Sequence, residues 1–577
     1  MVNSTQRWLV SRTNPEYVSY IAGAASVSAP FAQVLINRGL KDPSRISSFL
    51  DPAVSGLSDP YDLPGMDKAV ARIRAAAQRS QRVLVHGDYD ADGVTATSIM
   101  VEGLRRLGID TCYFIPNRMD HGYGFGEVGV QKAAETGAHL IVTVDCGITS
   151  FEAVTSANSL GIDVIITDHH EPALKQKPEN GSLDSAIFSL PEAVAVLNPK
   201  LRPSLTTAAD LSGAGVALKL MQGLLGGNAD NVAGFFDLAA IGTAADVVTV
   251  LDDNRIILRE GIGLLRSGVR PGIRALREAA GMRPDFLRMS SLYYTLIPRL
   301  NAAGRMEDAT DVVKLLTTDS EGEAGELALW LNRLNTRRQE VELRVYNEAL
   351  EMAKTMDPSA GAIVLASEGW HPGVVGIVAS RVAEEYNRPA FVLSLKDGVA
   401  SGSARSIPAF DIHRGLSRCG ELLRRFGGHK QAAGLSLNAC NLAAFGHMIS
   451  EVVMETLSED DFVPVLNIDA AVSLSDITVE LINEITRLEP FGYGNEEPVF
   501  GARGLEALQP RIVGNNHLKM YLRQNAYRID SIGFDLGGML PGIEGNGPVD
   551  AAFYPTINEW NGGRCVQLNI KALRPGR

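Results

Sequence analysis

A dense group of metal-binding side chains occupies residues 86–93, which read HGDYDADG. One imidazole, from His86, precedes three carboxylates, from Asp88, Asp90 and Asp92. Carboxylates held so close together repel one another unless a cation or exposure to water relieves the charge. Oxygen-rich sites with a few imidazole ligands suit Mg²⁺ or Mn²⁺, and the imidazole favours Mn²⁺. The segment is therefore a candidate divalent-cation site.

Three further segments place carboxylates or imidazoles directly after an apolar run. They supply Asp145 in DCG, the triplet Asp168-His169-His170, and Asp246 in IGTAADVV. Open α/β sheets bind their ligands at the carboxyl edge of the strands, so we expect these side chains to converge. Four or more carboxylates with two or three imidazoles can hold two cations ~3.5–4 Å apart, an arrangement suited to in-line displacement at phosphorus.

Each segment has a simpler interpretation when it is taken alone. A single Asp after a strand is usually a turn former or a helix N-cap, and a His-His pair lies more often on the surface than on a metal. The DYDADG run also resembles part of a Ca²⁺ loop, but it follows a strand and lacks the later bidentate Glu. The conjunction of all four segments is what favours a two-metal site.

The elements expected to position these residues alternate along the chain from Met66. Short apolar strands are predicted at residues 83–85, 112–115, 140–144, 164–167 and 194–197, with helices between them. This alternation indicates a parallel sheet covered on both faces. Residues 211–268 look largely helical, and residues 326–356 form a helical pattern without Gly or Pro that suggests a rigid connector.

The fold class is therefore α/β, with several domains. Punctuated short helices near the start predict a helical cap on the main domain, and a second α/β unit follows the long helix. The final segment has alternating strands with one helix near residues 476–488, which favours a small β-barrel. The expected domains are 1–65 (cap), 66–310 (catalytic), 311–358 (connecting helix), 359–458 (second α/β) and 459–577 (β-barrel).

Composition limits the class of protein. The 577 residues are too many for one core, and 45% of them are apolar. Five scattered cysteines without a CxxC pair suggest neither a disulfide framework nor a zinc site, so a reducing cytoplasm is expected. We expect no membrane span and no secretory signal. The net charge of −13 argues only weakly against a nucleic-acid partner, because binding depends on local basic surface.

Other segments could grip phosphate. Residues 298–305, PRLNAAGR, carry Asn301 and Arg305, and the planar fork of Arg matches phosphate oxygens. Residues 401–406, SGSARS, form a hydroxyl-rich strand, whereas residues 426–434, FGGHKQAAG, look like a Gly-rich loop. Each signal is weak alone, since an Arg-containing turn is usually solvated and a Gly-Gly loop is usually only a turn.

The segments VHGDYDADGVTA, TVDCGI, TDHH and IGTAADVV together resemble the successive motifs of the DHH phosphoesterase superfamily. That resemblance implies that His86, Asp90 and Asp145 hold one metal ion. A second ion would be held by Asp92, Asp145, His169 and Asp246, with Asp145 bridging the two. Asp88 is an alternative to His86, or a catalytic residue outside the ligand set. By the same resemblance His170 lies near the scissile phosphate and is not a ligand.

The SGSARS and FGGHKQAAG segments resemble the DHHA1 domain that accompanies DHH domains. PNR at residues 116–118 and LEPFGYGN at residues 488–495 resemble the RecJ branch, whose last domain is an OB-fold. In an OB-fold groove, Tyr521, Phe534, Tyr554 and Trp560 are candidates for stacking on bases, although core packing is the more usual role of such residues. The resemblance implies substrate contacts by Arg118, Asn301, Arg305, Ser403, Arg405 and His429.

The implied activity is 5′-to-3′ hydrolysis of single-stranded DNA to 5′-mononucleotides with two Mn²⁺ or Mg²⁺ ions. The resemblance also implies a role in recombination and in mismatch or base-excision repair, with single-strand-binding protein and a RecQ-type helicase as partners. One alternative is a hydrolase of short oligonucleotides or small nucleotides on the same core. Another is a non-catalytic DNA-binding scaffold, which the retained metal-binding residues disfavour.

Overall fold

The computed structural model describes residues 6–118, 120–122, 124–176, 187–202, 210–543, 547–560 and 563–576. The chain forms two compact units. Unit 1 contains residues 1–58, 247–259 and 465–577, and unit 2 contains residues 59–246 and 260–464. Among the described residues, no single helix is long and apolar enough to cross a membrane, although one bent helix pair, Pro15–Ala25 with Ala29–Asn37, meets the length and composition test.

Unit 2 begins with a five-stranded sheet in the order β3-β2-β4-β5-β8. Every neighbouring pair of strands is parallel, as the sequence predicted. The central strands are buried along their whole length because helices cover both faces. The strands are β2 (Val83–His86), β3 (Thr111–Phe114), β4 (Leu140–Val144), β5 (Asp163–Thr167) and β8 (Ala195–Leu197).

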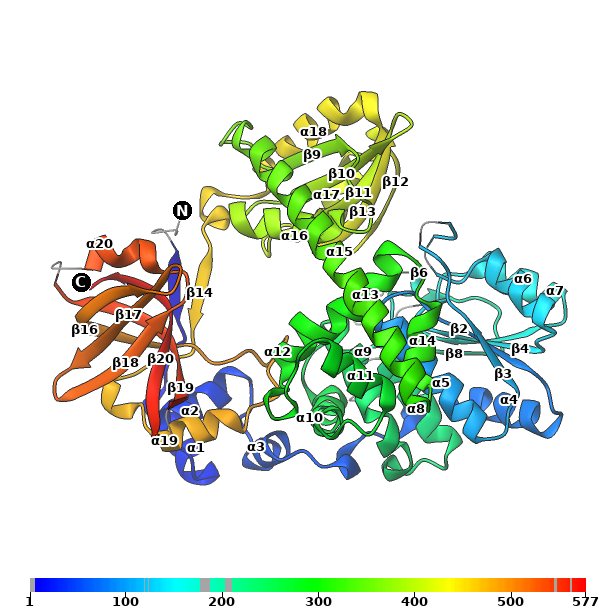
Figure 1. Ribbon diagram of the computed structural model, residues 1–577, viewed down its shortest axis with the longest axis horizontal. Coiled ribbons are helices and arrows are strands. Elements are labelled where there is room, and N and C mark those ends of the chain that lie inside the picture. Colours follow the sequence, from blue (N-terminus) through cyan, green and yellow to red (C-terminus); the bar gives the residue numbers. More distant parts are fainter. Residues whose placement is uncertain are drawn as a thin grey trace. The chain divides into compact units, whose positions relative to one another are not determined.

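The helices of this first α/β domain follow the strands and then form a helical region, as expected (Figure 1). Helices α5 and α9 are buried along most of their length, so both belong to the core rather than to the surface. The helices are α4 (Met66–Gln78), α5 (Ala91–Arg106), α6 (Glu127–Thr136), α7 (Phe151–Ser159), α8 (Gly213–Leu224), α9 (Phe236–Ala245), α10 (Asp252–Ser267), α11 (Pro271–Ala279), α13 (Ile297–Met306) and α14 (Thr310–Thr317).

The predicted connector is helix α15 (Glu321–Lys354), with 34 residues. Ser320 caps it by accepting a hydrogen bond from the backbone N–H of Glu323. At 1.5 Å per residue the helix is about 50 Å long. Its first half packs against α11 and α13, and its second half packs against the second α/β domain (Figure 1).

The second α/β domain has a five-stranded sheet in the order β12-β13-β11-β10-β9, in which only β9 and β10 are parallel. The segment FGGHKQAAG was expected to be a loop, but most of it belongs to two strands, and only residues 429–431 turn the chain between them. The elements are β9 (Ile363–Glu368), α16 (Val375–Tyr386), β10 (Ala390–Lys396), β11 (Val399–Arg405), α17 (Ile412–Arg418), β12 (Leu423–Gly428), β13 (Ala432–Asn438) and α18 (Leu442–Thr456).

Unit 1 contains a closed β-barrel. Pairing between β16 and β19 joins the ends of the strand order β16-β17-β18-β20-β19. Three strands have 12 to 14 residues, so they are longer than the sequence suggested. The elements are α19 (Val479–Thr486), β15 (Ala470–Ala471), β16 (Phe500–Val513), β17 (His517–Gln524), β18 (Tyr527–Gly533), β19 (Val549–Trp560) and β20 (Gly563–Pro575).

The N-terminal helices pack on this barrel, so our expectation of a cap on the main domain was wrong. Phe31 and Leu35 share one apolar core with Phe500 and Phe553 of the barrel. Strand β1 (Arg7–Val10) also pairs with β14 (Val465–Ile468). The helices are α1 (Pro15–Ala25), α2 (Ala29–Asn37) and α3 (Pro43–Leu50).

Candidate active site

Chain reversals at the carboxyl edge of the parallel sheet bring the predicted metal-binding residues together. Asp145 follows β4 directly and has a left-handed backbone with φ of 60°. His169 follows β5, and Asp90 is the N-cap of α5, where its carboxylate accepts a hydrogen bond from Gly93 N–H. Asp246 comes from the C-terminal end of α9. The metal-binding side chains at this edge of the sheet therefore come from two strand ends, one helix N-terminus and one helix C-terminus.

The ligand atoms lie close enough to share cations. Within each of three groups, one atom per residue lies within 4.8 Å of the others. His169 Nε2 is 3.1 Å from Asp145 Oδ1, and His169 Nδ1 is 3.5 Å from Asp246 Oδ2. Asp145 belongs to two groups, which suits the bridging position predicted for it. The groups are Asp88-Asp90-Asp145, Asp92-His169-Asp246 and Asp145-His169-His170.

Two buried atoms in this cluster, Asp145 Oδ1 and His169 Nε2, have no hydrogen-bond partner among the described residues. Buried polar atoms without partners are rare in folded proteins, and a bound ion is one of the standard explanations. Carboxylate oxygens and a neutral imidazole are the ligands that Mn²⁺ and Mg²⁺ accept. The residues present therefore fit a pair of divalent cations.

The electrostatics of the cluster also favour bound cations. Burial, reinforced by the neighbouring carboxylates, raises the pKa of Asp145 and of Asp88 well above the usual range. The same causes raise the pKa of Asp92 to about 7 and that of Asp246 to about 8. Burial lowers the pKa of His169 to about 3, so its imidazole is neutral and able to coordinate. Positive charge from metal ions would let the carboxylates ionise together.

The geometry favours Asp88 over His86 as the third ligand of the first ion. Asp88 groups with Asp90 and Asp145, whereas His86 is in none of the three groups. His86 Nδ1 instead lies 3.7 Å from Cys146 Sγ. A side chain at Gly129 would approach His86 Nε2 to 2.7 Å, so α6 covers that nitrogen. His86 is therefore packed behind the site, and its burial lowers its pKa to about 4.

Asp168 orients the two histidines that follow it. Its Oδ1 accepts hydrogen bonds from the backbone of His169 at 2.7 Å and from His170 Nδ1 at 2.7 Å. Its Oδ2 accepts one from Ile148 N–H at 2.9 Å. Burial opposes the charge on His170, but the hydrogen bond to Asp168 and the negative charges of Asp168, Asp246 and Asp88 together outweigh it and raise the pKa of His170 to about 9. His170 is thus a cation beside the metal-binding groups, as its predicted place near a phosphate requires.

Helix α8 supports the carboxylates from behind, a role that sequence reasoning missed. The backbone N–H groups of Gly213 and Ala214, at its start, donate to Asp92 at 2.7 and 2.9 Å. A helix N-terminus stabilises negative charge in this way. A side chain at Gly213 would approach Asp145 Oδ1 to 2.6 Å, so this position needs glycine. The run SGAG before a helix was the available signal.

Asn301 makes a contact that the sequence did not predict. It lies in α13, not in a surface turn, and its Oδ1 accepts a hydrogen bond from Ala91 N–H at 2.7 Å. In the same helix, a side chain at Gly304 would come within 2.4 Å of Tyr89 O. Helix α13 therefore holds the backbone of the metal-binding loop through the Asn301 oxygen. The predicted phosphate contact would use the amide N–H groups of Asn301 instead, and it stays a prediction.

Three arginines gather beside the metal-binding loop. The Arg118 guanidinium lies 5.6 Å from the centre of the Tyr89 ring. Arg305 donates to Gly373 O at 3.2 Å, which links the first α/β domain to the second. Burial, with Arg118 as the largest charge contribution, lowers the pKa of Arg305 to about 10 and lowers that of Arg405. Like charges held together in this way form a site for an anion.

Ser403 and Arg405 meet the start of α16. A side chain at Gly376 would lie 3.1 Å from Ser403 Oγ and 3.4 Å from the Arg405 guanidinium, so the three residues are in close contact. The other predicted substrate residue of this domain, His429, is exposed in the turn between β12 and β13. The structure thus brings Arg118, Arg305 and Arg405 together, with Ser403 beside them.

Comparison with known proteins agrees with this geometry. Residues 82–243 match the N-terminal domain of the DHH family, residues 359–455 match the DHHA1 domain, and residues 468–572 match the RecJ OB domain. The chain is 36% identical over 551 residues to the single-stranded-DNA-specific exonuclease RecJ of Salmonella typhimurium, covering 91% of this chain and 93% of that relative. The chain belongs to the RecJ family.

Other RecJ proteins support the assignment. The RecJ of Bacillus subtilis is 37% identical over 99% of this chain and 71% of that protein. The crystal structure of RecJ in complex with Mn²⁺ from Thermus thermophilus has a TM-score of 0.83 and 30% identity, covering 100% of this chain and 80% of that one. The predicted family and fold class, including an OB-fold for the last domain, are thereby confirmed.

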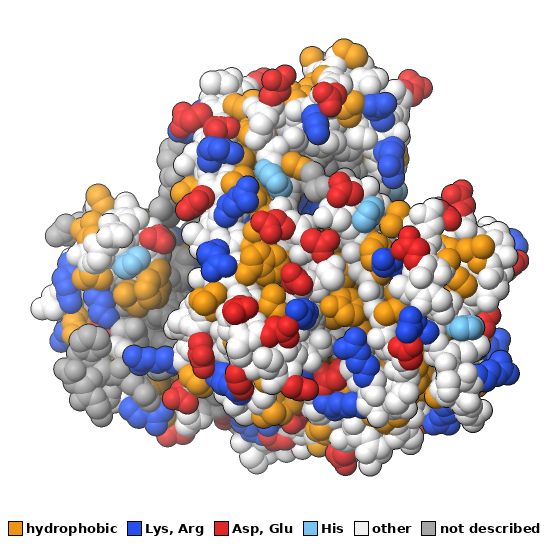
Figure 2. Space-filling model, turned by 45° about the vertical axis from the view of Figure 1, so that its right-hand side comes forward, with side chains coloured by type: hydrophobic (Ala, Val, Ile, Leu, Met, Phe, Trp, Pro, Cys, Tyr) orange, Lys and Arg blue, Asp and Glu red, His pale blue; other side chains and the backbone are white. Residues whose placement is uncertain are grey.

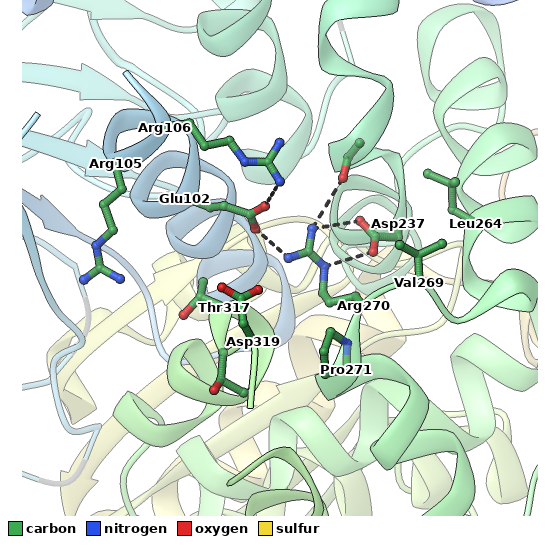
Figure 3. Close-up of a pocket in the computed structure, with 12 residues that line it drawn as sticks. Glu102, Arg105, Arg106, Asp237, Leu264, Val269, Arg270, Pro271, Thr317 and Asp319 are labelled. Atoms are coloured by element: carbon green, nitrogen blue, oxygen red, sulfur yellow. Dashed lines mark hydrogen bonds and ion pairs between the residues drawn. The ribbon is translucent and has the colours of Figure 1, made fainter. Parts of the chain in front are cut away.

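Behind the RecJ site, Arg270 ties together the two helices that carry Asp92 and Asp246. Its guanidinium lies 2.5 Å from Glu102 on α5 and 2.9 Å from Asp237 on α9 (Figure 3). These contacts lie at the opposite ends of α5 and α9 from the metal-binding side chains. They border a cavity of about 620 Å³ that also includes Arg105 and Arg106. The ion pairs therefore fix the distance between two ligand-bearing helices.

Proposed function

We propose that this protein is a single-stranded-DNA-specific exonuclease that removes mononucleotides from the 5′ end. The substrate and reaction follow from membership of the RecJ family, whose members here are named single-stranded-DNA-specific exonucleases. The observation that carries the polarity is the arginine cluster of Arg118, Arg305 and Arg405, which lies beside one end of the metal-binding groups. A terminal phosphate bound there would place the next phosphodiester linkage at the metal-binding groups.

The cofactor is Mn²⁺ or Mg²⁺, with two ions as the proposed complement. The similar RecJ structures from Thermus thermophilus are described as complexes with these metals. Asp88, Asp90 and Asp145 would hold one ion, and Asp92, Asp145, His169 and Asp246 would hold the other. When bound, such ions supply a hydroxide nucleophile at neutral pH and stabilise negative charge on the phosphoryl and leaving oxygens.

The protein's own side chains then orient the substrate. Asp168 keeps His170 protonated, so that His170 donates a hydrogen bond to an oxygen of the scissile phosphate. Arg118, Arg305 and Arg405, with the Ser403 hydroxyl, hold the 5′-terminal phosphate. This binding fixes one nucleotide between the terminal phosphate and the scissile linkage, so each turnover releases a 5′-mononucleotide.

The barrel of unit 1 offers side chains for holding a longer strand. The Arg528 guanidinium lies 3.7 Å from the centre of the Tyr521 ring, and Phe534 is 57% exposed. Aromatic faces and nearby cations bind single strands with little sequence preference. Tyr554 packs against an apolar core cluster, and the side chain of Trp560 lies outside the described residues. Tyr521 and Phe534 are thus the better stacking candidates.

The cellular context is a further part of the proposal. We place the protein in the cytoplasm, in recombination and in mismatch or base-excision repair, with single-strand-binding protein and a RecQ-type helicase as partners. Support comes from the resemblance to the RecJ branch alone. Fluorescence anisotropy with purified partners tests direct binding, and absence of binding at micromolar concentration would remove them from the proposal.

End-labelled single strands test the activity itself. A strand with 5′-³²P should yield labelled mononucleotide from the first turnover with Mn²⁺ or Mg²⁺ and no product with EDTA. A 3′-labelled strand should instead yield a ladder that shortens with time. Mononucleotide released first from the 3′ label would overturn the polarity, and equal rates on a dinucleotide and a long strand would favour a hydrolase of short oligonucleotides.

A further inference from the structure

The outer edge of β12 is an uncovered surface beside the proposed active site. In the order of the sheet, β12 is the last strand, so its outer edge pairs with no other described strand. Five of its six residues are exposed. Sheet edges are usually protected by charge, bulges or covering elements. Here a register shift between Leu423 and Arg425 leaves Arg424 out of the pairing with β13.

This edge begins next to the phosphate-binding residues of the second α/β domain. Arg405 is paired with Ala432 on β13, and Gly428, the last residue of β12, is paired with Ala433. Two strand spacings, about 10 Å in all, therefore separate the Arg405 backbone from the start of the edge. From Gly428 the strand leads back to Leu423, a distance of about 17 Å at 3.4 Å per residue.

The turn at this end of β12 lies nearer to His169 and His170 than to the two carboxylates beside the arginine cluster, Asp88 and Asp90. Partial burial, and then the positive charges of Lys200 and His170, lower the pKa of His429 in this turn. The charges of Lys200 and His429 also lower the pKa of His169. By the same measure, Arg118 lies near Asp88 and Arg305 lies near Asp90. A strand whose 5′ phosphate sits among the arginines therefore leaves the site past His429.

The side chains along the edge suit a nucleic-acid strand. Arg424 and Arg425 are exposed, and no described residue forms an ion pair with either. Phe426 is 37% exposed, and its ring centre lies 5.7 Å from that of His413 on α17. Arg425 is paired with Ser436 and Phe426 with the buried Leu435, so the two side chains lie on opposite faces of this edge. A nucleic-acid strand that crosses the edge can meet cations on one face and stack on the aromatic ring of the other. Figure 2 shows acidic and basic side chains interspersed over the face that it presents.

We infer that Arg424, Arg425 and Phe426, with His413, form a binding site for the nucleotides on the 3′ side of the scissile linkage. The two arginines contact backbone phosphates, and the paired rings receive a base. This site rests on the proposed function and deepens it, because it explains how the protein would favour a long single strand over a dinucleotide. Only a substrate that extends beyond the nucleotides bound at the metal ions can reach this site.

The experiment compares two 5′-phosphorylated substrates, a 20-nucleotide single strand and a dinucleotide. R424S/R425S should raise KM for the long strand about tenfold. The slope of log KM against log salt concentration should become smaller by about 1.4, which is about 0.7 for each lost phosphate contact. Phe426→Ser should raise the same KM about fivefold or more, the lower bound expected for one lost stacking contact. Both variants should leave kcat/KM for the dinucleotide within twofold of wild type.

R79S is the matched control, because Arg79 is another exposed arginine but lies just before the amino end of β2. Circular dichroism and the thermal midpoint check that each variant is folded. If R424S/R425S and R79S have the same KM for the long strand, the inferred site is wrong while the exonuclease function stands. Equal losses on both substrates would also overturn it, and a wild type without 5′ exonuclease activity would instead remove the proposed function.

Discussion

Asp145 Oδ1 lies 3.1 Å from His169 Nε2, and both atoms are buried without a hydrogen-bond partner in the part of the chain that the structure describes. The two residues come from adjacent strand ends, β4 and β5, whose register brings Val144 opposite Thr167. Neutral His169 offers a lone pair and Asp145 offers carboxylate oxygens, so one cation would satisfy both. The metal-dependent properties of the protein should therefore depend on this pair.

Mn²⁺ should stabilise the wild-type protein through Asp145. A ligand that binds only the folded state at 100 times its Kd adds about 2.7 kcal/mol. We expect Mn²⁺ to raise the thermal midpoint of the wild type, as measured by calorimetry, and to have little effect on Asp145→Asn. Without metal, Asp145→Asn should be more stable than wild type, because one of the crowded carboxylates is removed. An equal Mn²⁺ shift in both proteins would contradict the assignment.

Asn301 should affect metal binding rather than substrate recognition. Asn301→Ala removes the acceptor for Ala91 N–H, which loosens the loop between Asp90 and Asp92. We expect about tenfold weaker Mn²⁺ binding by electron paramagnetic resonance, with an unchanged preference for 5′-phosphorylated ends. Asn301→Asp keeps the acceptor and should retain more of the affinity. A variant that binds Mn²⁺ normally but loses the end preference would restore the phosphate-binding role first predicted for this residue.

The carboxyl-edge positions could be predicted because apolar runs with polar termini define strand ends. The same reasoning could not choose between His86 and Asp88, since they lie two positions apart in the chain and only the tertiary packing of α6 on His86 decides. The contact of Asn301 with Ala91 could not be predicted, because a run of small residues with Arg does not show that it forms a helix packed on the metal-binding loop. The partner of the N-terminal helices was also hidden, because periodicity shows that a helix has an apolar face but not what covers it.

Arg270 should be important for stability. Its ion pairs with Glu102 and Asp237 are largely buried, with side chains that are 11%, 16% and 9% exposed. Arg270→Met leaves the buried Asp237 without its cation and leaves Glu102 paired only with the exposed Arg106, and breaking a buried pair in this way typically costs about 3–5 kcal/mol. Urea unfolding should show this loss, and R270M/E102Q/D237N should recover most of it. A loss below about 1 kcal/mol in R270M would show that the three side chains do not clamp α5 to α9.

His170 should set an alkaline limit for activity. Its pKa is raised to about 9, so its cationic form persists from neutral pH and is lost as the pH rises through about 9. Bound Mn²⁺ opposes the charge on His170, so we expect kcat/KM of the Mn²⁺-loaded enzyme to fall on the alkaline side at or below that pH. Asp168→Asn removes the partner that raises the pKa of His170, and should shift this fall towards lower pH. An alkaline limb at the same pH in both proteins would assign the titration to another group.

Arg405 should determine the preference for a phosphorylated 5′ end. Its guanidinium lies against Gly376 and Ser403, in the arginine cluster that we assign to the terminal phosphate. The Arg405→Ala variant lacks a charge-assisted hydrogen bond worth about 1.5–3 kcal/mol. Its kcat/KM should therefore be lower by roughly 10- to 150-fold. This loss should appear with 5′-phosphorylated strands and be at least fivefold smaller with 5′-hydroxyl strands.

Arg405→Lys is the informative companion variant. Lysine keeps the charge but not the planar fork, so it should recover part of the preference for phosphorylated ends without restoring it fully. Parallel digestion of 5′-phosphate and 5′-hydroxyl strands by each variant measures the preference directly. Equal losses on the two kinds of end would mean that Arg405 supports the fold or the metal-binding groups, and the 5′ anchor would then have to be sought at Arg118 or Arg305.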